Sequence, residues 1–229
     1  MELSKRLYTI AQQVPKGAVV ADIGTDHGYI PIYLYKENII KKAIATDINK
    51  GPLQRAEQNI KAHHAEKAIE TRLGNGLEPI QPNETDTLIL AGMGGMLIID
   101  ILNNCPDLVK GVNRIILQPQ LDQKEIRQYL HKIHFKIINE EIIYEDNKYY
   151  WIITAEPGNE EYNDKKYYLF GKKLLEERNP ILMKYIEEKL IQLRNILEKL
   201  KETSTQNTLR RINEIEQEIK LFEEAWECL

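Results

Sequence analysis

Apolar residues in the first two thirds of the chain fall into two alternating kinds of segment. Short runs of consecutive apolar residues are separated by longer stretches in which apolar positions recur every three or four residues. The short runs predict buried strands, and the periodic stretches predict amphipathic helices. This alternation predicts an α/β fold, a mostly parallel Rossmann-like sheet with helices on both faces. The predicted strands span residues 18–23, 43–47, 69–73, 86–91 and 114–117.

The predicted sheet is flanked by two further features. Ser4 is placed to cap a first amphipathic helix, with Leu7 and Ile10 on its apolar side. Residues 135–144 and 148–155 predict a closing antiparallel hairpin. Such a terminal hairpin is unusual in a plain dinucleotide-binding fold, and it is similar to the last two strands of a Rossmann-like class I methyltransferase sheet.

The pattern changes after Pro157-Gly158, which predicts a boundary between a domain of residues 1–158 and one of residues 159–229. Beyond it, two segments carry apolar residues in alternating steps of four and three, separated by the polar stretch 202–208. This pattern predicts an antiparallel α-helical hairpin with a coiled-coil-like seam. The expected seam residues are Ile186, Leu190, Leu193, Leu197, Leu200, Ile212, Ile215, Ile219, Phe222 and Trp226.

Composition narrows the function classes. The formal charge of −4 and the lack of a long basic block argue against a positive electrostatic field over the whole surface that would attract nucleic acid. A local basic face is still compatible with this composition. Cys105 and Cys228 lack metal-binding spacing, and the histidines offer no complete ligand set, so we expect free thiols and no metal. No apolar run is long enough to cross a bilayer. We therefore expect a cytoplasmic protein without a membrane partner.

The first strand ends in a turn that carries glycine and two acids, within the run Ala21–Pro31. A strand, a glycine turn and a helix bring the backbone close to a nucleotide-like ligand. Gly24 fits the dinucleotide-binding pattern, but Asp26 stands where that pattern has a glycine and would repel a pyrophosphate. An ammonium group would instead be attracted, which favours S-adenosylmethionine over NAD or ATP. The alternative is that Asp22 and Asp26 only cap the turn and the helix.

The ends of the next strands add to this prediction. Asp47 can accept hydrogen bonds from both ribose hydroxyls, and Asn75, between Gly74 and Gly76, can pair with an adenine edge. The alternative for Asn75 is a tight turn that needs unusual backbone angles. In the fourth turn, small residues would let the backbone and a target base approach the methyl group. That turn is Ala91-Gly92-Met93-Gly94-Gly95.

These motifs together resemble the bacterial tRNA (adenine(22)-N(1))-methyltransferase family. The resemblance covers residues 1 to about 156 in order, and the helical tail fits the smaller C-terminal domain of the family. It implies an S-adenosylmethionine-dependent enzyme that methylates N1 of adenine 22 in tRNA, which composition and periodicity do not show. Two positions vary within the family: Gly28 is alanine in many relatives, and Asp47 can be glutamate. The resemblance rests on Ala21–Pro31, Gly51-Pro52 with Asn59, Arg72–Leu77, Ala91–Gly95 and Leu117-Gln118-Pro119.

We expect three overlapping sets of site residues. The candidate catalytic residues are Asp26 and His27, with Asp26 acting on the exocyclic amine of adenine or on the ammonium of the cofactor. The candidate cofactor-binding residues are Asp22, Gly24, Asp26, His27, Asp47, Gly74, Asn75, Gly76, Ala91, Gly92 and Met93. The candidate substrate-binding residues are Arg6, Tyr29, Gly94, Gly95, Gln118 and Pro119.

Several alternatives stay open on the sequence alone. His27 could be a turn histidine bonded to the backbone, Tyr29 a buried core tyrosine, and Gln118-Pro119 a loop that only ends the strand. The acceptor could be another RNA or a small molecule, or the protein could be a non-catalytic cofactor-binding scaffold. The helical hairpin could bind the body of the tRNA or mediate dimerisation. Because its apolar seam is satisfied within the hairpin, we favour a monomer that contacts RNA.

Overall fold

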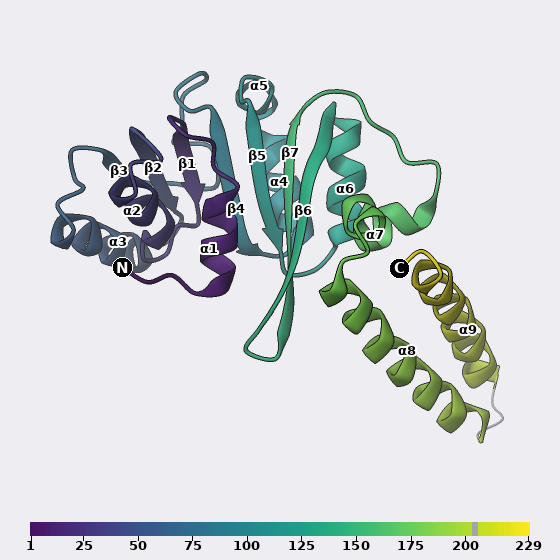
Figure 1. The fold of residues 1–229 in the computed structure, drawn as a ribbon. Helices are drawn as coiled ribbons and strands as arrows, with labels where there is room; N and C mark the ends of the chain where they lie inside the picture. The colour runs from purple at the N-terminus through teal and green to yellow at the C-terminus, as the bar shows by residue number, and fades with distance from the viewer. Residues whose placement is uncertain (203–205) are drawn as a thin grey trace. The chain divides into compact units, whose positions relative to one another are not determined.

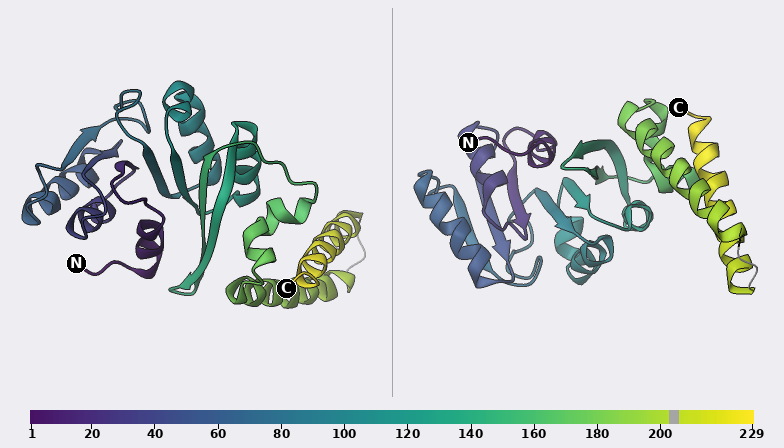
Figure 2. Two further views of the ribbon diagram at one scale, coloured as in Figure 1. Left: turned by 45° about the horizontal axis from the view of Figure 1, so that its top comes forward. Right: turned by 90° about the horizontal axis from the view of Figure 1, so that it is seen from below.

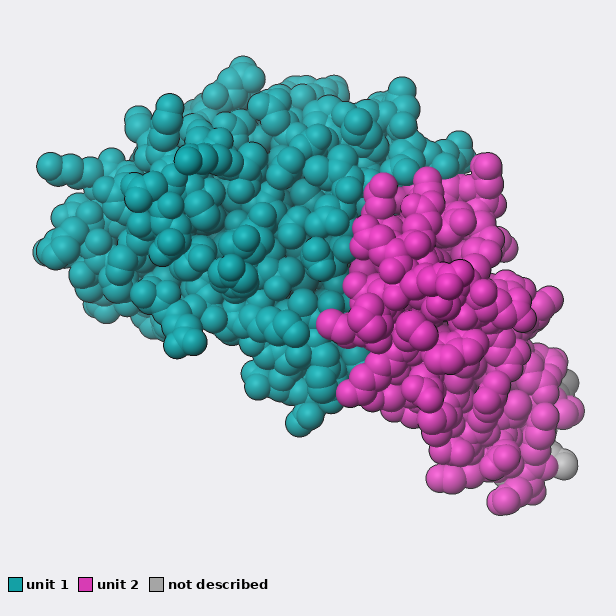
Figure 3. Space-filling view, in the orientation of Figure 1, with its two compact units in different colours: residues 1–161 teal, residues 162–229 magenta. Residues whose placement is uncertain are grey.

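The computed structural model describes residues 1–202 and 206–229. It divides into two compact units, residues 1–161 and residues 162–229 (Figure 3). Each unit is described by itself below. No helix in the described part of the chain combines the length and the apolar character needed to cross a bilayer.

The first unit is built on a seven-stranded sheet in the order β3-β2-β1-β4-β5-β7-β6 (Figure 1). The pairs β1–β2, β2–β3, β1–β4 and β4–β5 are parallel, whereas β7 runs antiparallel to both β5 and β6. This is a Rossmann-like sheet with the predicted closing hairpin. The strands are β1 (Val19–Ile23), β2 (Lys42–Asp47), β3 (Ile69–Leu73), β4 (Thr87–Met93), β5 (Arg114–Pro119), β6 (Phe135–Glu145) and β7 (Lys148–Pro157).

Helices cover both faces of this sheet (Figure 2). The consecutive residues Leu88, Ile89 and Leu90 of β4 are all 0% exposed, although alternate side chains of a strand point to opposite faces. Burial on both faces explains why the strands appear in the sequence as continuous apolar runs. The helices of this unit are α1 (Lys5–Gln12), α2 (Tyr29–Lys36), α3 (Lys50–Ala62), α4 (Gly95–Asn104), α5 (Pro106–Lys110) and α6 (Gln123–Lys132).

The element boundaries differ from the sequence prediction at the functional edge of the sheet. Strands β4 and β5 run on through Met93 and Pro119, because Ala91 pairs with Gln118 and Met93 with Pro119 around a bulge. Gly92 occupies the bulge with φ +77°, a left-handed conformation that glycine adopts without strain. The helix expected from Pro31 begins at Tyr29. The short helix α5 was not predicted, since five residues are too few to show a periodicity.

The second unit contains η1 (Tyr167–Gly171), α7 (Lys172–Glu176), α8 (Pro180–Lys201) and α9 (Gln206–Trp226). Ion pairs join Arg194 to Glu223 at 2.8 Å and Lys201 to Glu216 at 3.0 Å, which shows that α8 and α9 run antiparallel. The polar stretch 202–208 includes residues 203–205, which lie outside the described residues. Of the expected seam, Ile186, Leu190, Leu193, Ile215, Ile219 and Phe222 are buried, whereas Trp226 is 40% exposed.

The amino end of α8 offers a first test of this fold. The side-chain oxygen of Asn179 accepts hydrogen bonds from the backbone amides of Ile181 at 2.9 Å and Leu182 at 3.3 Å. We expect Asn179→Ala to lower the free energy of unfolding by about 1 kcal/mol, because both amides lose their acceptor. Urea denaturation followed by circular dichroism measures this loss. Asn179→Asp keeps the acceptor and should match the wild type; equal stability of the alanine variant would contradict the capping role.

Candidate active site

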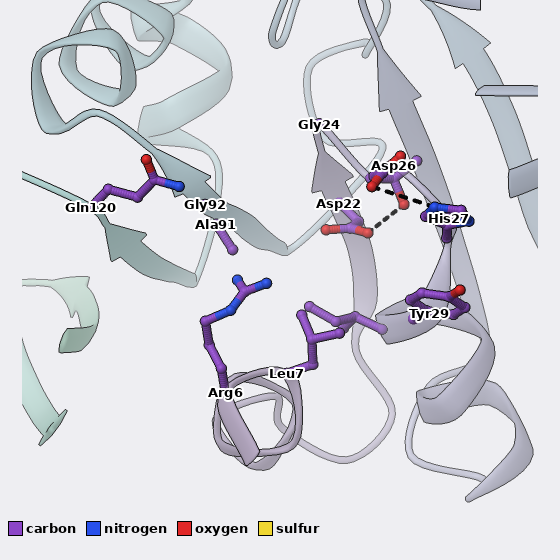
Figure 4. Close-up of a pocket in the computed structure, with 12 residues that line it drawn as sticks. Arg6, Leu7, Asp22, Gly24, Asp26, His27, Tyr29, Ala91, Gly92 and Gln120 are labelled. Carbon is purple, nitrogen blue, oxygen red and sulfur yellow. Dashed lines mark hydrogen bonds and ion pairs between the residues drawn. The ribbon is translucent and has the colours of Figure 1, made fainter. Parts of the chain in front are cut away.

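A cavity of about 330 Å³ opens at the carboxyl ends of β1 and β4 (Figure 4). The strand order reverses between β1 and β4, since β2 and β3 lie on one side of β1 and β5 on the far side of β4. In open α/β sheets, ligands bind at such a reversal. Below, this cavity is called the cleft. It is lined by Arg6, Leu7, Asp22, Gly24, Thr25, Asp26, His27, Tyr29, Ile30, Ala91, Gly92 and Gln120.

Asp22 is the buried acid of the cleft. It is 4% exposed, and its carboxylate accepts a hydrogen bond from the Thr25 hydroxyl at 2.5 Å. Burial raises the pKa of Asp22 to about 6; the bond from Thr25 opposes the rise and the negative charge of Asp47 adds to it. A cation in the cleft would favour the charged carboxylate and reverse this shift. The site is therefore suited to a positively charged group.

The turn after Asp22 brings the backbone close to the cleft. Gly24 has φ +70°, and its amide and that of Thr25 both donate to the carbonyl of Thr46 on β2, at 2.8 and 2.9 Å. A Cβ on Gly24 would lie 2.4 Å from the terminal carbon of Met93. The end of the Met93 side chain could move aside, but the positive φ would strain any residue with a Cβ at this position. The turn therefore presents backbone to the cleft.

Asp26, His27 and Tyr29 form the next part of the wall (Figure 4). Asp26 is exposed and lies 3.2 Å from Arg55 and 3.7 Å from the ring of His27. The rings of His27 and Tyr29 are stacked, with centroids 5.0 Å apart and planes 5° from parallel. Tyr29 is 39% exposed, so the alternative of a buried core tyrosine is wrong. Although Asn59 donates to the backbone carbonyl of His27 at 2.9 Å, the histidine side chain still borders the cleft.

The residues that were expected to bind the ribose and the adenine lie along the same edge of the sheet, outside the lining of the cleft. Asp47 ends β2, is 8% exposed, and accepts a hydrogen bond from the Asn49 amide at 2.8 Å. Its backbone carbonyl accepts from the Gly74 amide at 3.1 Å, which joins the ends of β2 and β3. Asn75 is exposed on that turn, and its amide donates to Glu78 at 3.4 Å.

The glycines on either side of Asn75 pack closely against neighbouring side chains. A Cβ on Gly74 would lie 2.8 Å from Pro79, and a Cβ on Gly76 would lie 2.8 Å from Ile101. Gly76 also has φ +56°. These contacts account for both glycines as parts of a tight turn, while the exposed side chain of Asn75 stays available to a ligand.

The residues expected at the ends of β4 and β5, some for the cofactor and some for the acceptor, are only partly in the cleft. Ala91 and Gly92 line it, whereas Gly94 precedes α4, and a Cβ on Gly95 would lie 2.6 Å from the Leu121 carbonyl. Gln118 and Pro119 are buried on β5. Gln120, which sequence reasoning missed, reaches the cleft instead.

The lining residues that were not predicted differ in the signal that the sequence offers for them. Alternation along an extended chain puts Gln120 on the same side as Gln118, and that signal could have identified it. Leu7, Thr25 and Ile30 also line the cleft; Thr25 and Ile30 belong to the run Ala21–Pro31, but their residue types did not mark them as site residues. Their place depends on how α1 and α2 pack at the edge of the sheet.

Arg6 connects α1 to this edge. Its guanidinium donates to the Gln118 side-chain carbonyl at 2.9 Å and lies 5.6 Å from the centre of the Tyr150 ring. The carboxylate of Glu145, at the end of β6, accepts from the backbone amides of Lys5 at 2.6 Å and Arg6 at 3.1 Å. Glu145 thus fixes the start of α1, which carries Arg6 and Leu7 into the cleft.

Removal of this anchor should loosen α1. We expect Glu145→Ala to speed amide hydrogen exchange of residues 5–12 about fivefold, because a partly exposed, charge-assisted anchor of this kind contributes about 1 kcal/mol. Hydrogen-exchange mass spectrometry measures the rate. Glu141→Ala, a change of the same kind on the same strand, should leave exchange in α1 unaltered. Equal exchange in the wild type and Glu145→Ala would contradict the anchoring role.

Neither cysteine forms a disulfide in the structure. Among the described residues, no group of three or more His, Cys, Asp or Glu side chains is arranged to hold a metal ion. The polar and aromatic groups that line the cleft include two acids, the stacked rings of His27 and Tyr29, and Arg6.

Comparison with known proteins places this geometry in a family. A family model described as "Methyltransferase domain" matches residues 3–153. A tRNA (adenine(22)-N(1))-methyltransferase of Bacillus subtilis (strain 168) is 35% identical over 98% of this chain and 97% of its own length.

Two solved structures extend the likeness to the fold. The B. subtilis M1A22 tRNA methyltransferase TrmK superposes with a TM-score of 0.89 at 34% identity, covering 98% of this chain and 99% of that one. Streptococcus pneumoniae Sp1610, described as a putative tRNA (m1A22) methyltransferase in complex with S-adenosyl-L-methionine, gives a TM-score of 0.89 at 31% identity, covering 98% and 100%. The family expected from the motifs is confirmed: this chain belongs to the tRNA (adenine(22)-N(1))-methyltransferase family.

Proposed function

We propose that this protein binds S-adenosylmethionine at the carboxyl edge of its sheet and transfers the methyl group to N1 of adenine 22 in tRNA. The observation that carries the proposal is the buried carboxyl of Asp22 at the point where the strand order reverses. A carboxylate withdrawn from water needs a positive partner, and the proposed cofactor carries an ammonium group and a sulfonium. The relatives reported above support the same activity.

The residues of this edge fit the proposed cofactor. Asp22 would hold the ammonium group, with Gly24 and Gly92 giving the room that a side chain would fill. Asp47 would accept from the ribose hydroxyls, and Asn75 would pair with the adenine edge. We assign supporting places in the same binding edge to Asp26, His27, Gly74, Gly76, Ala91 and Met93.

When bound, S-adenosylmethionine supplies a methyl group that is already activated on sulfur. Adenine N1 has an in-plane lone pair and needs no prior deprotonation. The task of the protein is then to align N1 with the methyl group and to exclude water. Positive charge develops on the base, and we propose that Asp26 stabilises it while His27 shapes the acceptor pocket. Tyr29, whose ring is exposed and stacked on His27, would stack on the target base.

The acceptor side is proposed to be formed by Arg6 and the ends of β4 and β5. Arg6 can pair with a tRNA phosphate, and Gln118 would position it through the hydrogen bond of 2.9 Å. Pro119 shapes this strand end, Gly94 and Gly95 form the turn into α4, and Gln120 contributes a polar side chain to the cleft.

We assign methyl transfer to a domain of residues 1–158 and contact with the body of the tRNA to residues 159–229. The helical hairpin buries its seam between α8 and α9, so we propose that the protein acts as a monomer. Since the proposed substrate is tRNA, we place the reaction in the cytoplasm.

Mapping of the methylated nucleotide tests this proposal. The purified protein is incubated with deuterated-methyl S-adenosylmethionine and an unmodified tRNA transcript, and nuclease fragments are analysed by mass spectrometry. We expect one labelled 1-methyladenine, at position 22, and none in a transcript with guanine there. Label in ribosomal RNA or in small molecules alone would favour another acceptor. No transfer to any acceptor would favour a scaffold.

A further inference from the structure

Large apolar side chains are exposed at one edge of the methyltransferase unit. In the described part of residues 1–161, the exposed large apolar residues other than Met1 and Tyr8 all lie at or just after the carboxyl ends of the parallel strands. Tyr29 follows β1, and Ile48 and Leu73 lie at the ends of β2 and β3, on the side of the proposed cofactor site. Met96, Leu97 and Leu121 follow β4 and β5, on the acceptor side.

The three acceptor-side residues form what we call the apolar ledge: Met96, Leu97 and Leu121. Their exposed fractions are 51%, 52% and 67%. Leu121 directly follows Gln120, which lines the cleft, and the Gly95 amide donates to the Leu121 carbonyl, so the ledge lies at the same ends of β4 and β5 as the acceptor side of the cleft. Grouped exposed apolar side chains beside a polar site are typical of a binding surface.

The backbone that carries the ledge is held in place by three hydrogen bonds. The Gly95 amide donates to the Leu121 carbonyl at 3.2 Å, and the Met96 amide donates to the Asp122 carboxylate at 3.2 Å. The Gln120 amide donates to the Met93 carbonyl at 2.8 Å. A Cβ on Gly95 would lie 2.6 Å from the Leu121 carbonyl, so the two loops pack without a gap. The exposure therefore belongs to a fixed conformation.

The proposed reaction supplies the occupant of this surface. N1 lies on the Watson–Crick edge of adenine, so a stacked and paired adenine has to leave the base stack before N1 can reach a methyl group. Proteins that hold nucleic acid in such a state insert apolar side chains between bases. We propose that the apolar ledge contacts the nucleobases next to the target adenine, with Leu121 filling the space that the adenine leaves in the stack. This inference rests on the proposed function.

Fluorescence of the target position separates this role from a structural one. The probe is a full-length tRNA transcript with 2-aminopurine at position 22, whose emission rises when the base leaves the stack. We expect wild-type protein to raise the emission and Leu121→Ala to give less than half of that rise. With unmodified transcript, kcat/KM for tRNA should fall about tenfold, because the complex loses the apolar contact of one leucine side chain. The affinity for S-adenosylmethionine should stay unchanged, because Leu121 lies on the acceptor side.

Two controls sharpen the test. Leu121→Met keeps an apolar side chain of similar volume and should retain the emission and the rate. A transcript with a mismatch at the target adenine lowers the energy needed for extrusion, so it should recover most of the rate lost in Leu121→Ala. Ile48→Ala removes an equally exposed apolar side chain on the cofactor side and should leave the emission of 2-aminopurine unaltered.

The inference is overturned if Leu121→Ala and the variant with alanine at all three ledge positions methylate tRNA within twofold of wild type and raise emission equally. It is also overturned if sedimentation shows a wild-type dimer that Leu121→Ala dissociates, since the ledge would then join two copies of the chain. Failure of the proposed function looks different: the wild type itself would transfer no methyl group to tRNA.

Discussion

The affinity of this protein for S-adenosylmethionine should fall about tenfold when the pH is lowered from 7 to 5. The pKa of Asp22 is raised to about 6, chiefly by burial. With that value, about nine tenths of the carboxyl groups are ionised at pH 7 and about one tenth at pH 5. Only the ionised form attracts the ammonium group, so cofactor binding should follow the ionised fraction.

Asp22→Asn should remove both the attraction and its pH dependence. The amide keeps an oxygen that accepts from the Thr25 hydroxyl but carries no charge. We expect its affinity at pH 7 to be ten- to a hundredfold below that of the wild type, as for a charge-assisted hydrogen bond. Isothermal titration calorimetry between pH 5 and 8 measures both effects. His27→Gln is the control, because it replaces a neighbouring side chain of the cleft and keeps the Asp22 carboxyl, so the pH dependence should stay in place.

The same residue should affect the stability of the free protein in the opposite direction. The pKa of Asp22 in the folded protein lies above its ordinary value of 3.8, so ionisation destabilises the folded state. This loss is absent below about pH 4, develops as the pH rises towards 6, and is complete at pH 7. Asp22→Asn should therefore raise the free energy of unfolding by up to about 3 kcal/mol at pH 7 and leave it nearly unchanged at pH 4.

These opposite effects make the prediction specific. A variant that is more stable without ligand but binds the cofactor more weakly is expected where a group has been kept for function at the expense of stability. If Asp22→Asn bound S-adenosylmethionine with the affinity and pH dependence of the wild type, Asp22 would not be the residue that binds the ammonium group. The pH dependence would then have to come from another group.

The sequence predicts the sheet because each strand is specified locally. Runs such as Leu88-Ile89-Leu90 are buried on both faces and are continuous in the sequence, and their short length and flanking turns distinguish them from helices. Gly24 and Gly92 mark the turns, since only glycine readily takes their positive φ angles. These local signals were sufficient to locate the edge of the sheet where the candidate acids gather.

Features that depend on contacts between distant segments could not be predicted in this way. Alternation from Gln118 indicates the side on which Gln120 lies, but its place at the cleft also depends on the pairing of β4 and β5 through Met93 and Pro119, a register that neither strand specifies by itself. Tyr29 is exposed although the apolar run Ile30-Pro31-Ile32 follows it in the sequence, and its ring stacks on that of His27. The anchoring of α1 by Glu145 joins residues about 140 positions apart, and no local pattern indicates it.

Replacement of Asp26 should lower the rate of methyl transfer far more than the affinity for the cofactor. Asp26 is exposed and already paired with Arg55 at 3.2 Å, so its attraction for an ammonium group is screened by solvent and by that cation. We expect the buried carboxylate of Asp22 to bind the ammonium group more strongly. Asp26 is therefore better placed to stabilise positive charge on the adenine, which develops only during transfer.

We expect Asp26→Asn to lower the single-turnover rate of transfer about a hundredfold, the effect of losing one preorganised electrostatic group, with the dissociation constant of S-adenosylmethionine changed less than about threefold. Asparagine is the informative substitution because Asp26 has φ +46°, which asparagine adopts readily. Asp26→Ala should reduce transfer at least as much but adds strain in the backbone. Rapid-quench measurement of methylated tRNA and calorimetry of cofactor binding separate the two quantities.

Each outcome for Asp26 assigns a different role. A large loss of cofactor affinity with a normal transfer rate at saturation would place its carboxylate on the ammonium group. Near-normal values of both would show that Asp26 only shapes the turn. Arg55→Ala removes the paired cation and leaves the carboxylate, so a loss that matched Asp26→Asn would mean that the ion pair acts as a unit. If instead the carboxylate alone stabilises the charged base, Arg55→Ala should keep the transfer rate at saturating tRNA within a few fold of wild type.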